Sequence, residues 1–313
     1  MSIKNKRALE FSFTWLFAVI IGAAILVLAV YAATKVIGSG QAETSTAAAK
    51  EIGVLLNPLE TSFEEASSTS LALPVDTRIY NRCNSVEGSG FGGQIIQTSQ
   101  KSFGKWSDLS TEIEFQNKYI FSDEYEEGKV FHIFSKPFDF PFKVADAIYL
   151  TSSNKKYCFI DSRDLPDDIK NELSDLKQGN LIIAKDCPDN AIRVCFGSET
   201  GCNVKVRYGQ GYVERNGERV YFETDTLMYA AIFSNNKNYE CHVKRLMARA
   251  EELSKLYESK AISLSQKGCD SNIDIGTFGI ILENYENSMD LRTIFPKANE
   301  MGEQNRNTQC KLW

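Results

Sequence analysis

The reactive side chains that stand out in this 313-residue chain are its eight cysteines. An even number of cysteines in an exported domain is typical of a disulfide framework, because disulfides persist in oxidising compartments. Structural zinc sites usually hold two cysteines separated by about two to four residues. The closest cysteines here are separated by six and seven residues. We therefore expect disulfides, and neither a metal site nor an iron–sulfur cluster, at Cys83, Cys158, Cys187, Cys195, Cys202, Cys241, Cys269 and Cys310.

The cysteine spacing narrows the roughly 105 pairings that eight cysteines allow. Cys195 and Cys202 flank a glycine-containing turn between two expected strands, so they can face each other across a hairpin. Cys241 and Cys269 cannot pair if one helix joins them, because their 28-residue separation would rise about 42 Å, against a limit of roughly 7 Å between Cα atoms. Other connectivities stay open, but we favour Cys195–Cys202 first, then Cys269–Cys310 and Cys158–Cys187, which leaves Cys83–Cys241.

Catalytic groups are scarce. The chain has two histidines, His132 and His242, and histidine is the side chain that most often transfers protons near neutral pH. A thiol–imidazole pair would need a free cysteine, which disulfide formation removes. The GxGxxG match at 88–93 is followed by a strand-prone segment, whereas dinucleotide binding requires a helix there. We expect no enzyme active site and no cofactor.

The longest uncharged segment, 11–34, predicts on which side of a membrane the cysteines and histidines lie. Its 24 residues would rise about 36 Å as a helix, enough to cross a hydrocarbon core of roughly 30 Å. Three cations precede it and only Lys35 follows closely, so the positive-inside rule places the N-terminus in the cytoplasm. We predict a cytoplasmic segment 1–10, a single transmembrane helix over 11–36 in the cell membrane, and an extracytoplasmic remainder. A cleaved signal peptide is the alternative, although its apolar core is normally about 7 to 15 residues long.

The segment KNKRALEF, residues 4–11, runs straight into the apolar helix. It resembles the class III signal of archaeal type IV pilin-like proteins, and the remainder resembles uncharacterised archaeal membrane-anchored proteins. The resemblance implies processing at the Asn5–Lys6 bond, although Asn5 stands where the family usually has glycine. It also implies that Glu10 neutralises the free amine of a neighbouring subunit during filament assembly.

Glu10 and two small residues are the candidates for helix assembly. A carboxylate at the edge of the hydrocarbon is costly unless it is paired. The alternative interpretation of Glu10 is a first-turn acid that the helix dipole favours. Ala18 and Gly22 have the four-residue spacing that lets two helices approach closely.

The remaining sequence predicts a linker and one folded domain. Residues 37–72, rich in Ala, Ser, Thr and Glu, predict a stalk, and 73–313 predict an extracytoplasmic α+β domain. Its first part, about 75–235, has the pattern of strands, including 227–233, and Asn216–Gly217 is typical of a two-residue hairpin turn. A short helix is expected near Asp164, and longer helices over 238–266, where apolar residues recur with a period near 3.6, and around 289–304. The expected fold is a largely antiparallel, disulfide-stapled sheet covered by long C-terminal helices.

The charge narrows the class of partner. The chain carries −6, and because its first 35 residues carry +3, the remainder carries −9. Such an acidic domain argues against nucleic acid, whose binding depends on clustered cations. The expected partners are the lipid bilayer and, through the transmembrane helix, other membrane-anchored subunits. We expect a structural or assembly component of the cell surface, of a pilin-like kind; the alternatives are an anchored extracellular ligand-binding module and, third, an extracytoplasmic enzyme.

Overall fold

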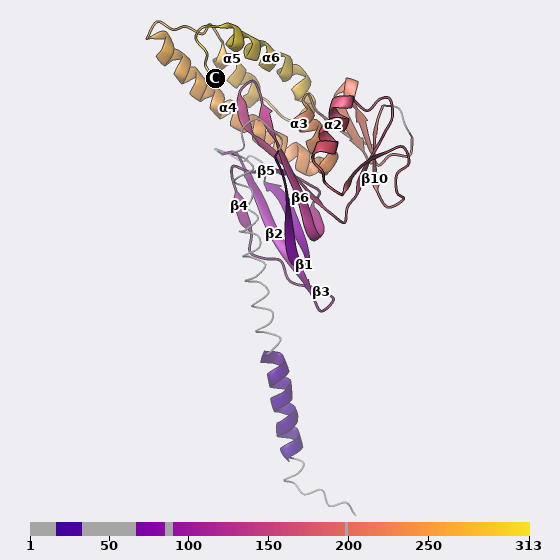
Figure 1. The fold of residues 1–313 in the computed structure, drawn as a ribbon. Helices are drawn as coiled ribbons and strands as arrows, with labels where there is room; N and C mark the ends of the chain where they lie inside the picture. Colours follow the sequence, from indigo (N-terminus) through magenta and orange to yellow (C-terminus); the bar gives the residue numbers. More distant parts are fainter. Residues whose placement is uncertain (1–16, 33–66, 85–89, 198–199) are drawn as a thin grey trace, which may run out of the picture.

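The computed structural model describes residues 17–32, 67–84, 90–197 and 200–313 (Figure 1). Of the predicted transmembrane helix over 11–36, the stretch 17–32 is helical and exposed along its whole length, and the rest, like Glu10, lies outside the described residues. Its apolar side chains face solvent, with Val27 69% exposed. Within the described ranges, no helix combines the length and the apolar character that crossing a bilayer requires. The transmembrane segment therefore stays a prediction.

The first sheet is built around a long central strand, β1 (Ser67–Asn84). Its strands follow the order β3-β2-β1-β6-β7-β5, with β4 also paired to β2, and every pair is antiparallel except β5 with β7. The other members are β2 (Gly93–Ser102), β3 (Lys105–Trp106), β4 (Ile113–Phe115), β5 (Tyr119–Phe121), β6 (Tyr125–Asp139) and β7 (Lys143–Ser152).

The boundary that we predicted between stalk and domain is wrong. Residues 67–72, assigned to the stalk, already pair with β6, from Ser67 opposite Ser135 to Ala72 opposite Val130. The serines and threonines of this segment gave it the composition of a linker. Ladder hydrogen bonds involve only the backbone, so polar side chains do not prevent pairing.

The second sheet departs in part from the largely antiparallel pairing that we expected and that the first sheet follows. Its order is β13-β12-β11-β10-β8-β9. The pairs among β8 to β11 are parallel, and the pairs β11–β12 and β12–β13 are antiparallel. Parallel neighbours need a crossover, and helix α2 (Asp167–Asp175), the short helix expected near Asp164, supplies it between β8 and β9. The strands are β8 (Tyr157–Ile160), β9 (Leu181–Ala184), β10 (Ile192–Phe196), β11 (Val204–Arg207), β12 (Tyr212–Arg215) and β13 (Glu218–Tyr221).

The hairpin between β12 and β13 confirms the turn expected at Asn216–Gly217. Both residues have positive φ, 54° and 84°. These values suit a two-residue type I′ turn, which asparagine and glycine accept at low cost.

The strand predicted over 227–233 is wrong, because this segment belongs to helix α3 (Asp225–Phe233). Thr224 caps the helix by accepting a 3.3 Å hydrogen bond from the backbone amide of Leu227. The helix contacts strands of both sheets, and Thr226 to Phe233 are all buried. A helix that is buried on all sides has no polar face, so its sequence does not show the 3.6-residue period of an amphipathic helix. A short, continuous run of apolar residues is then indistinguishable from the sequence of a buried strand.

The C-terminal helices cover one side of the domain (Figure 1). The two that we expected over 238–266 and 289–304 are confirmed as α4 and α6, whereas α5 was not predicted. Their amphipathic faces complete a large aromatic and aliphatic core shared with both sheets. The remaining helical elements are α4 (Asn236–Ser265), α5 (Ile275–Glu283), α6 (Leu291–Asn307) and the 3₁₀ turns η1 (Tyr208–Gln210) and η2 (Ser288–Asp290).

All eight cysteines are paired, in the four combinations that we favoured. The geometry expected for one pair is nevertheless wrong. Cys195 and Cys202 do not face each other across a hairpin, because β10 and β11 are parallel, with Val194 opposite Val204. Gly197 and Gly201 both have positive φ, which lets the short connection reverse direction. The Cα–Cα distances are 6.1 Å for Cys83–Cys241, 5.8 Å for Cys158–Cys187, 6.0 Å for Cys195–Cys202 and 5.6 Å for Cys269–Cys310.

Candidate functional site: a polar cleft beside the first turn of α4

A cleft of about 850 Å³ opens where the first sheet, the β7–β8 connection and the first turn of α4 meet. Its lining is unusually rich in amides and charges. Three cations and four carboxylates share it with a single aromatic ring, that of Tyr125. The six asparagines that line it are Asn81, Asn84, Asn154, Asn190, Asn235 and Asn238.

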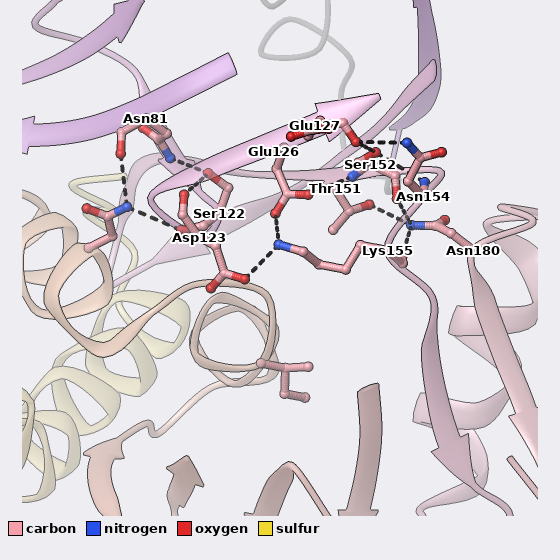
Figure 2. A network of polar contacts seen from close by, with 12 residues as sticks. Asn81, Ser122, Asp123, Glu126, Glu127, Thr151, Ser152, Asn154, Lys155 and Asn180 are labelled. Atoms are coloured by element: carbon pink, nitrogen blue, oxygen red, sulfur yellow. Dashed lines mark hydrogen bonds and ion pairs between the residues drawn. The ribbon is translucent and has the colours of Figure 1, made fainter. Parts of the chain in front are cut away.

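A three-residue ion cluster forms one wall (Figure 2). The Lys155 Nζ atom lies 2.8 Å from Asp123 Oδ2 and 2.7 Å from Glu126 Oε1. Burial raises the pKa of the fully buried Glu126 carboxyl, against the lowering effect of the Lys155 charge. Burial acts to lower the pKa of Lys155, but the charges of Glu126 and Asp123 outweigh it, so that pKa is raised. Arg215 supplies a second cation for the two carboxylates, since its Nη1 lies 3.0 Å from Asp123 Oδ1.

The β7–β8 connection holds this cluster in place. The backbone amide of Ser152 donates to Glu126 Oε2 at 3.0 Å, and Ser152 Oγ donates to the Glu127 carbonyl at 2.5 Å. Gly128 permits this approach, because a Cβ at that position would lie 2.6 Å from Ser152 Oγ. Asn180 also holds this connection, because its Nδ2 donates to Thr151 Oγ1 at 2.9 Å (Figure 2). The buried carboxylate is thus fixed by backbone as well as by charge.

A buried amide network forms the opposite wall. Asn81 Nδ2 donates to the Ile120 carbonyl at 2.8 Å and to Ser122 Oγ at 2.7 Å. Asn238 Nδ2, from α4, donates to the Asn81 carbonyl at 3.1 Å and to the Ser122 carbonyl at 3.3 Å. The disulfide Cys83–Cys241 ties the same strand to the same helix. The Nδ2 groups of these two asparagines therefore stabilise the fold and are already hydrogen-bonded, so they are not free to bind a ligand.

Four other asparagines keep hydrogen-bonding groups that no described residue uses. Asn84 and Asn190 are exposed and their side chains make no hydrogen bond within the described part of the chain. Asn235 uses only its oxygen, which caps α4 by accepting from the Asn238 amide at 2.9 Å. Asn154 uses only its nitrogen, which donates to the Glu127 carbonyl at 3.2 Å. The cleft therefore offers both donors and acceptors.

The charges of the cleft are largely matched by ion pairs. Arg82 pairs with Glu112, and Glu127 lies 2.7 Å from Arg78. Among the charged lining residues that the structure describes, Glu124 and Lys237 alone make no ion pair, and their charges are opposite. The Tyr125 ring is 44% exposed, with the Tyr80 ring centroid 5.6 Å away. The arrangement suits hydrogen bonding and ring stacking rather than binding of a net charge.

The residues singled out from the sequence lie elsewhere. Neither histidine lines the cleft: His132 is half-buried on β6, and His242 is fully buried on α4. Every cysteine is in a disulfide, so no thiol–imidazole pair forms. Ala18 and Gly22 lie on the exposed helix 17–32, and a Cβ at Gly22 would meet nothing within 4 Å. Within the described ranges, no group of three or more His, Cys, Asp or Glu side chains is arranged to hold a metal ion.

Sequence reasoning did not find the cleft residues. They come from segments as distant as Asn81 and Asn238, which are 157 positions apart. No motif joins them, and the one local signal was an asparagine, Asn235, directly before a helical period. Comparison of the chain with protein-family models, with curated proteins and with solved structures found no match. The function is therefore inferred from this chain alone.

The buried histidine gives a pH prediction. Burial, together with the charge of Arg245, holds the pKa of His242 well below its usual value of 6.5. Below about pH 6.5 the unfolded chain therefore binds a proton that the folded chain does not. The free energy of unfolding should fall by about 1.4 kcal/mol for each pH unit below that point. Urea unfolding at several pH values should show this slope in the native chain and not in His242→Gln.

The matched control is His132→Gln. Burial also lowers the pKa of His132, but that group is only half-buried. This variant should keep the steep loss of stability that His242 causes. Equal slopes for the native chain and for His242→Gln would contradict the assignment.

Proposed function

We propose that this chain is a single-span membrane protein, N-terminus in the cytoplasm, whose extracytoplasmic domain binds a small polar ligand. The observation that carries the proposal is the cleft of about 850 Å³. This volume lies in the range of small-molecule sites, roughly 300 to 1,000 Å³. The cleft has two fixed walls, and the amide groups left over on Asn84, Asn154, Asn190 and Asn235 line it.

Membrane anchoring is supported by composition and by the disulfides. The uncharged segment 11–34 has the length of a span, and the helix 17–32 exposes apolar side chains that no described residue covers. Four disulfides in one domain are stable in an oxidising compartment, which for this topology is the cell exterior.

The chemistry of the cleft favours a neutral, polyhydroxylated ligand such as a sugar. Most charges of the cleft are already paired, and the two charged lining residues that make no ion pair with a described residue, Glu124 and Lys237, have opposite signs, so the unpaired charges cancel and favour no ionic ligand of one sign. Hydroxyl groups instead both donate and accept, as the free amides do. The exposed Tyr125 ring offers a flat apolar surface for the carbon face of a sugar ring.

Ligand-observed NMR on the full chain in nanodiscs tests the binding proposal. The probes are neutral oligosaccharides of glucose, galactose and mannose, with glucuronate and glucosamine as charged comparisons. We expect a neutral probe to bind, and the double variant Asn84→Ala/Asn190→Ala to weaken it about tenfold to a hundredfold, since each amide hydrogen bond contributes about 0.5 to 1.5 kcal/mol. Asn307→Ala, an exposed asparagine on α6 outside the cleft, is the control. Binding that survives the double variant, or no binding at all, would reject the proposal.

Alkaline extraction and protease accessibility test the anchor. The full chain should stay in the membrane pellet at high pH, and protease added to intact cells or spheroplasts should reach the domain from outside. Release by alkali, or protection of the domain until the membrane is opened, would reject the topology.

Pilin-like assembly is the second candidate, and one observation favours it. Ala18 and Gly22 lie four residues apart on the helix 17–32, with open space beside Gly22. Small residues at this spacing let a second helix approach, and Glu10 could then meet a neighbour's amine. Mass spectrometry of the protein from native membranes should find an N-terminus at Lys6. A chain that still begins at Met1 would exclude the processed form.

A further inference from the structure

The turn between β2 and β3 places a phenylalanine where neither folding nor solubility favours one. Ser102 pairs with Lys105, so Phe103 and Gly104 alone form the turn, with φ of 48° and 79°. The first position of such a turn favours asparagine, aspartate or glycine, because left-handed backbone strains bulky side chains. Phe103 is also 96% exposed, the highest value among the described large apolar residues. Neither the backbone nor packing within the domain accounts for it.

The neighbours of Phe103 share one character. Lys101 and Lys105 are exposed on either side of the tip. Trp106 follows, with the Arg78 guanidinium carbon 4.1 Å and Lys101 Nζ 5.6 Å from its ring centroid. The segment 99–107 contains no carboxylate, although residues 67–313 together carry a net charge of −5. An apolar tip flanked by lysines and a tryptophan is the composition of membrane-interface segments.

We propose that the β2–β3 turn enters the surface of the bilayer that anchors the chain, with Phe103 among the acyl chains and the two lysines at anionic headgroups. This inference rests on the proposed membrane anchor. It requires the tip to lie at the membrane-facing end of the domain. β2 runs antiparallel to β1, with Thr77 opposite Gln100, so the tip lies toward the end of the sheet at which β1 begins. That is the end at which the chain arrives from its N-terminal span.

A lipid surface fits this turn better than a protein partner does. A stable protein interface needs roughly 800 Å² from each side, far more than one two-residue turn provides. Membrane insertion needs only one apolar side chain with cations beside it, because the cations add attraction to anionic lipid. The 30 residues from 37 to 66 can extend up to about 100 Å, so their length permits the domain to return to the bilayer.

The test places a fluorescent label beside the tip. All eight native cysteines are in disulfides, so Ser102→Cys introduces one reactive thiol for the environment-sensitive dye NBD while Phe103 stays in place. The full chain is reconstituted in vesicles of phosphatidylcholine and phosphatidylglycerol, 3:1, with or without spin-labelled lipid. We expect a blue-shifted emission that spin-labelled lipid quenches at least threefold more than it quenches NBD at Asn307→Cys on α6. Phe103→Asn in the labelled chain should abolish the difference, because asparagine suits the turn but does not enter lipid.

Two results would overturn the inference. Quenching of the Ser102→Cys label by aqueous iodide, without quenching by lipid, would place the tip in water. Protection from both quenchers would indicate burial by protein instead. Trp15, within the uncharged segment, separates this failure from failure of the anchor: brominated lipid should quench the native chain more than Trp15→Phe. Loss of that signal rejects the anchor, whereas its presence without quenching at Ser102→Cys rejects only the contact of the turn.

Discussion

Replacing Cys83 and Cys241 together by serine should lower the free energy of unfolding by about 4 to 5 kcal/mol. The disulfide joins β1 to α4 across 158 residues. In the chain-entropy account, a cross-link stabilises by restricting the unfolded chain, and a loop of about 100 residues corresponds to about 4.7 kcal/mol. The two disulfides inside this loop shorten it without removing its length advantage. Both cysteines are half-buried, so the serine hydroxyls can still reach water.

The disulfide Cys195–Cys202 supplies the matched comparison. It closes a loop of only 7 residues, and because Cys195 is buried, the variant that compares best is Cys195→Ala/Cys202→Ser, which should lose about 2 kcal/mol. Urea unfolding of the full chain in detergent, followed by circular dichroism, measures both losses. Equal losses in the two double variants would contradict the loop-length explanation. Because Cys241 lies one turn from Asn238, the Cys83/Cys241 variant should also loosen the cleft, and ligand binding should weaken with it.

Arg245→Ala should cost about 3 to 5 kcal/mol of unfolding free energy. The guanidinium is fully buried and donates to the carbonyls of Phe91 at 2.9 Å, Gln116 at 2.8 Å and Lys118 at 2.9 Å. It also lies 4.7 Å from the Tyr119 ring centroid. Removing it leaves three carbonyl groups without their donor and opens a cavity beneath α4. Buried polar groups that lose their partners account for losses of this size.

Lysine should not rescue this position. Its ammonium is a point charge and cannot reach three carbonyls that a planar, forked guanidinium spans, so Arg245→Lys should lose most of the same stability. Arg249→Ala is the control, because Arg249 lies one turn further along α4 and its side chain makes no hydrogen bond or ion pair with the described residues. Urea unfolding should show less than about 1 kcal/mol for that variant. A loss of similar size for Arg245→Ala would mean that the three carbonyls find other partners.

Local patterns predicted much of the secondary structure because they depend on neighbours in the chain. The 3.6-residue period predicted α4, and the Asn216–Gly217 pair predicted its hairpin, since each signal is complete within one segment. Helix α3 was missed for the opposite reason. Its residues are buried by both sheets, and burial on all sides erases the polar face that would have identified a helix.

The cysteines show where sequence reasoning stops. Spacing and elimination led to the four pairs, yet the expected hairpin at Cys195–Cys202 was wrong. A disulfide limits a Cα–Cα distance but not the direction of the strands that carry it. Strand direction in the second sheet depends on long-range packing, such as that of β8, β12 and β13 against α3, which involves residues far apart in the chain.

By itself, the sequence determined the uncharged N-terminal segment, the acidic charge of the remaining chain, the even set of cysteines and the helices with an exposed face. Each of these is a property of composition or of short-range period. The tertiary structure alone decided the cleft, because Asn81 and Asn238 meet across 157 residues and Lys155 finds Asp123 and Glu126 only when β6 pairs with β7. It alone also decided the exposure of Phe103, since the same phenylalanine in another turn could have joined the core. Long-range packing brings such groups together, and no local pattern records it.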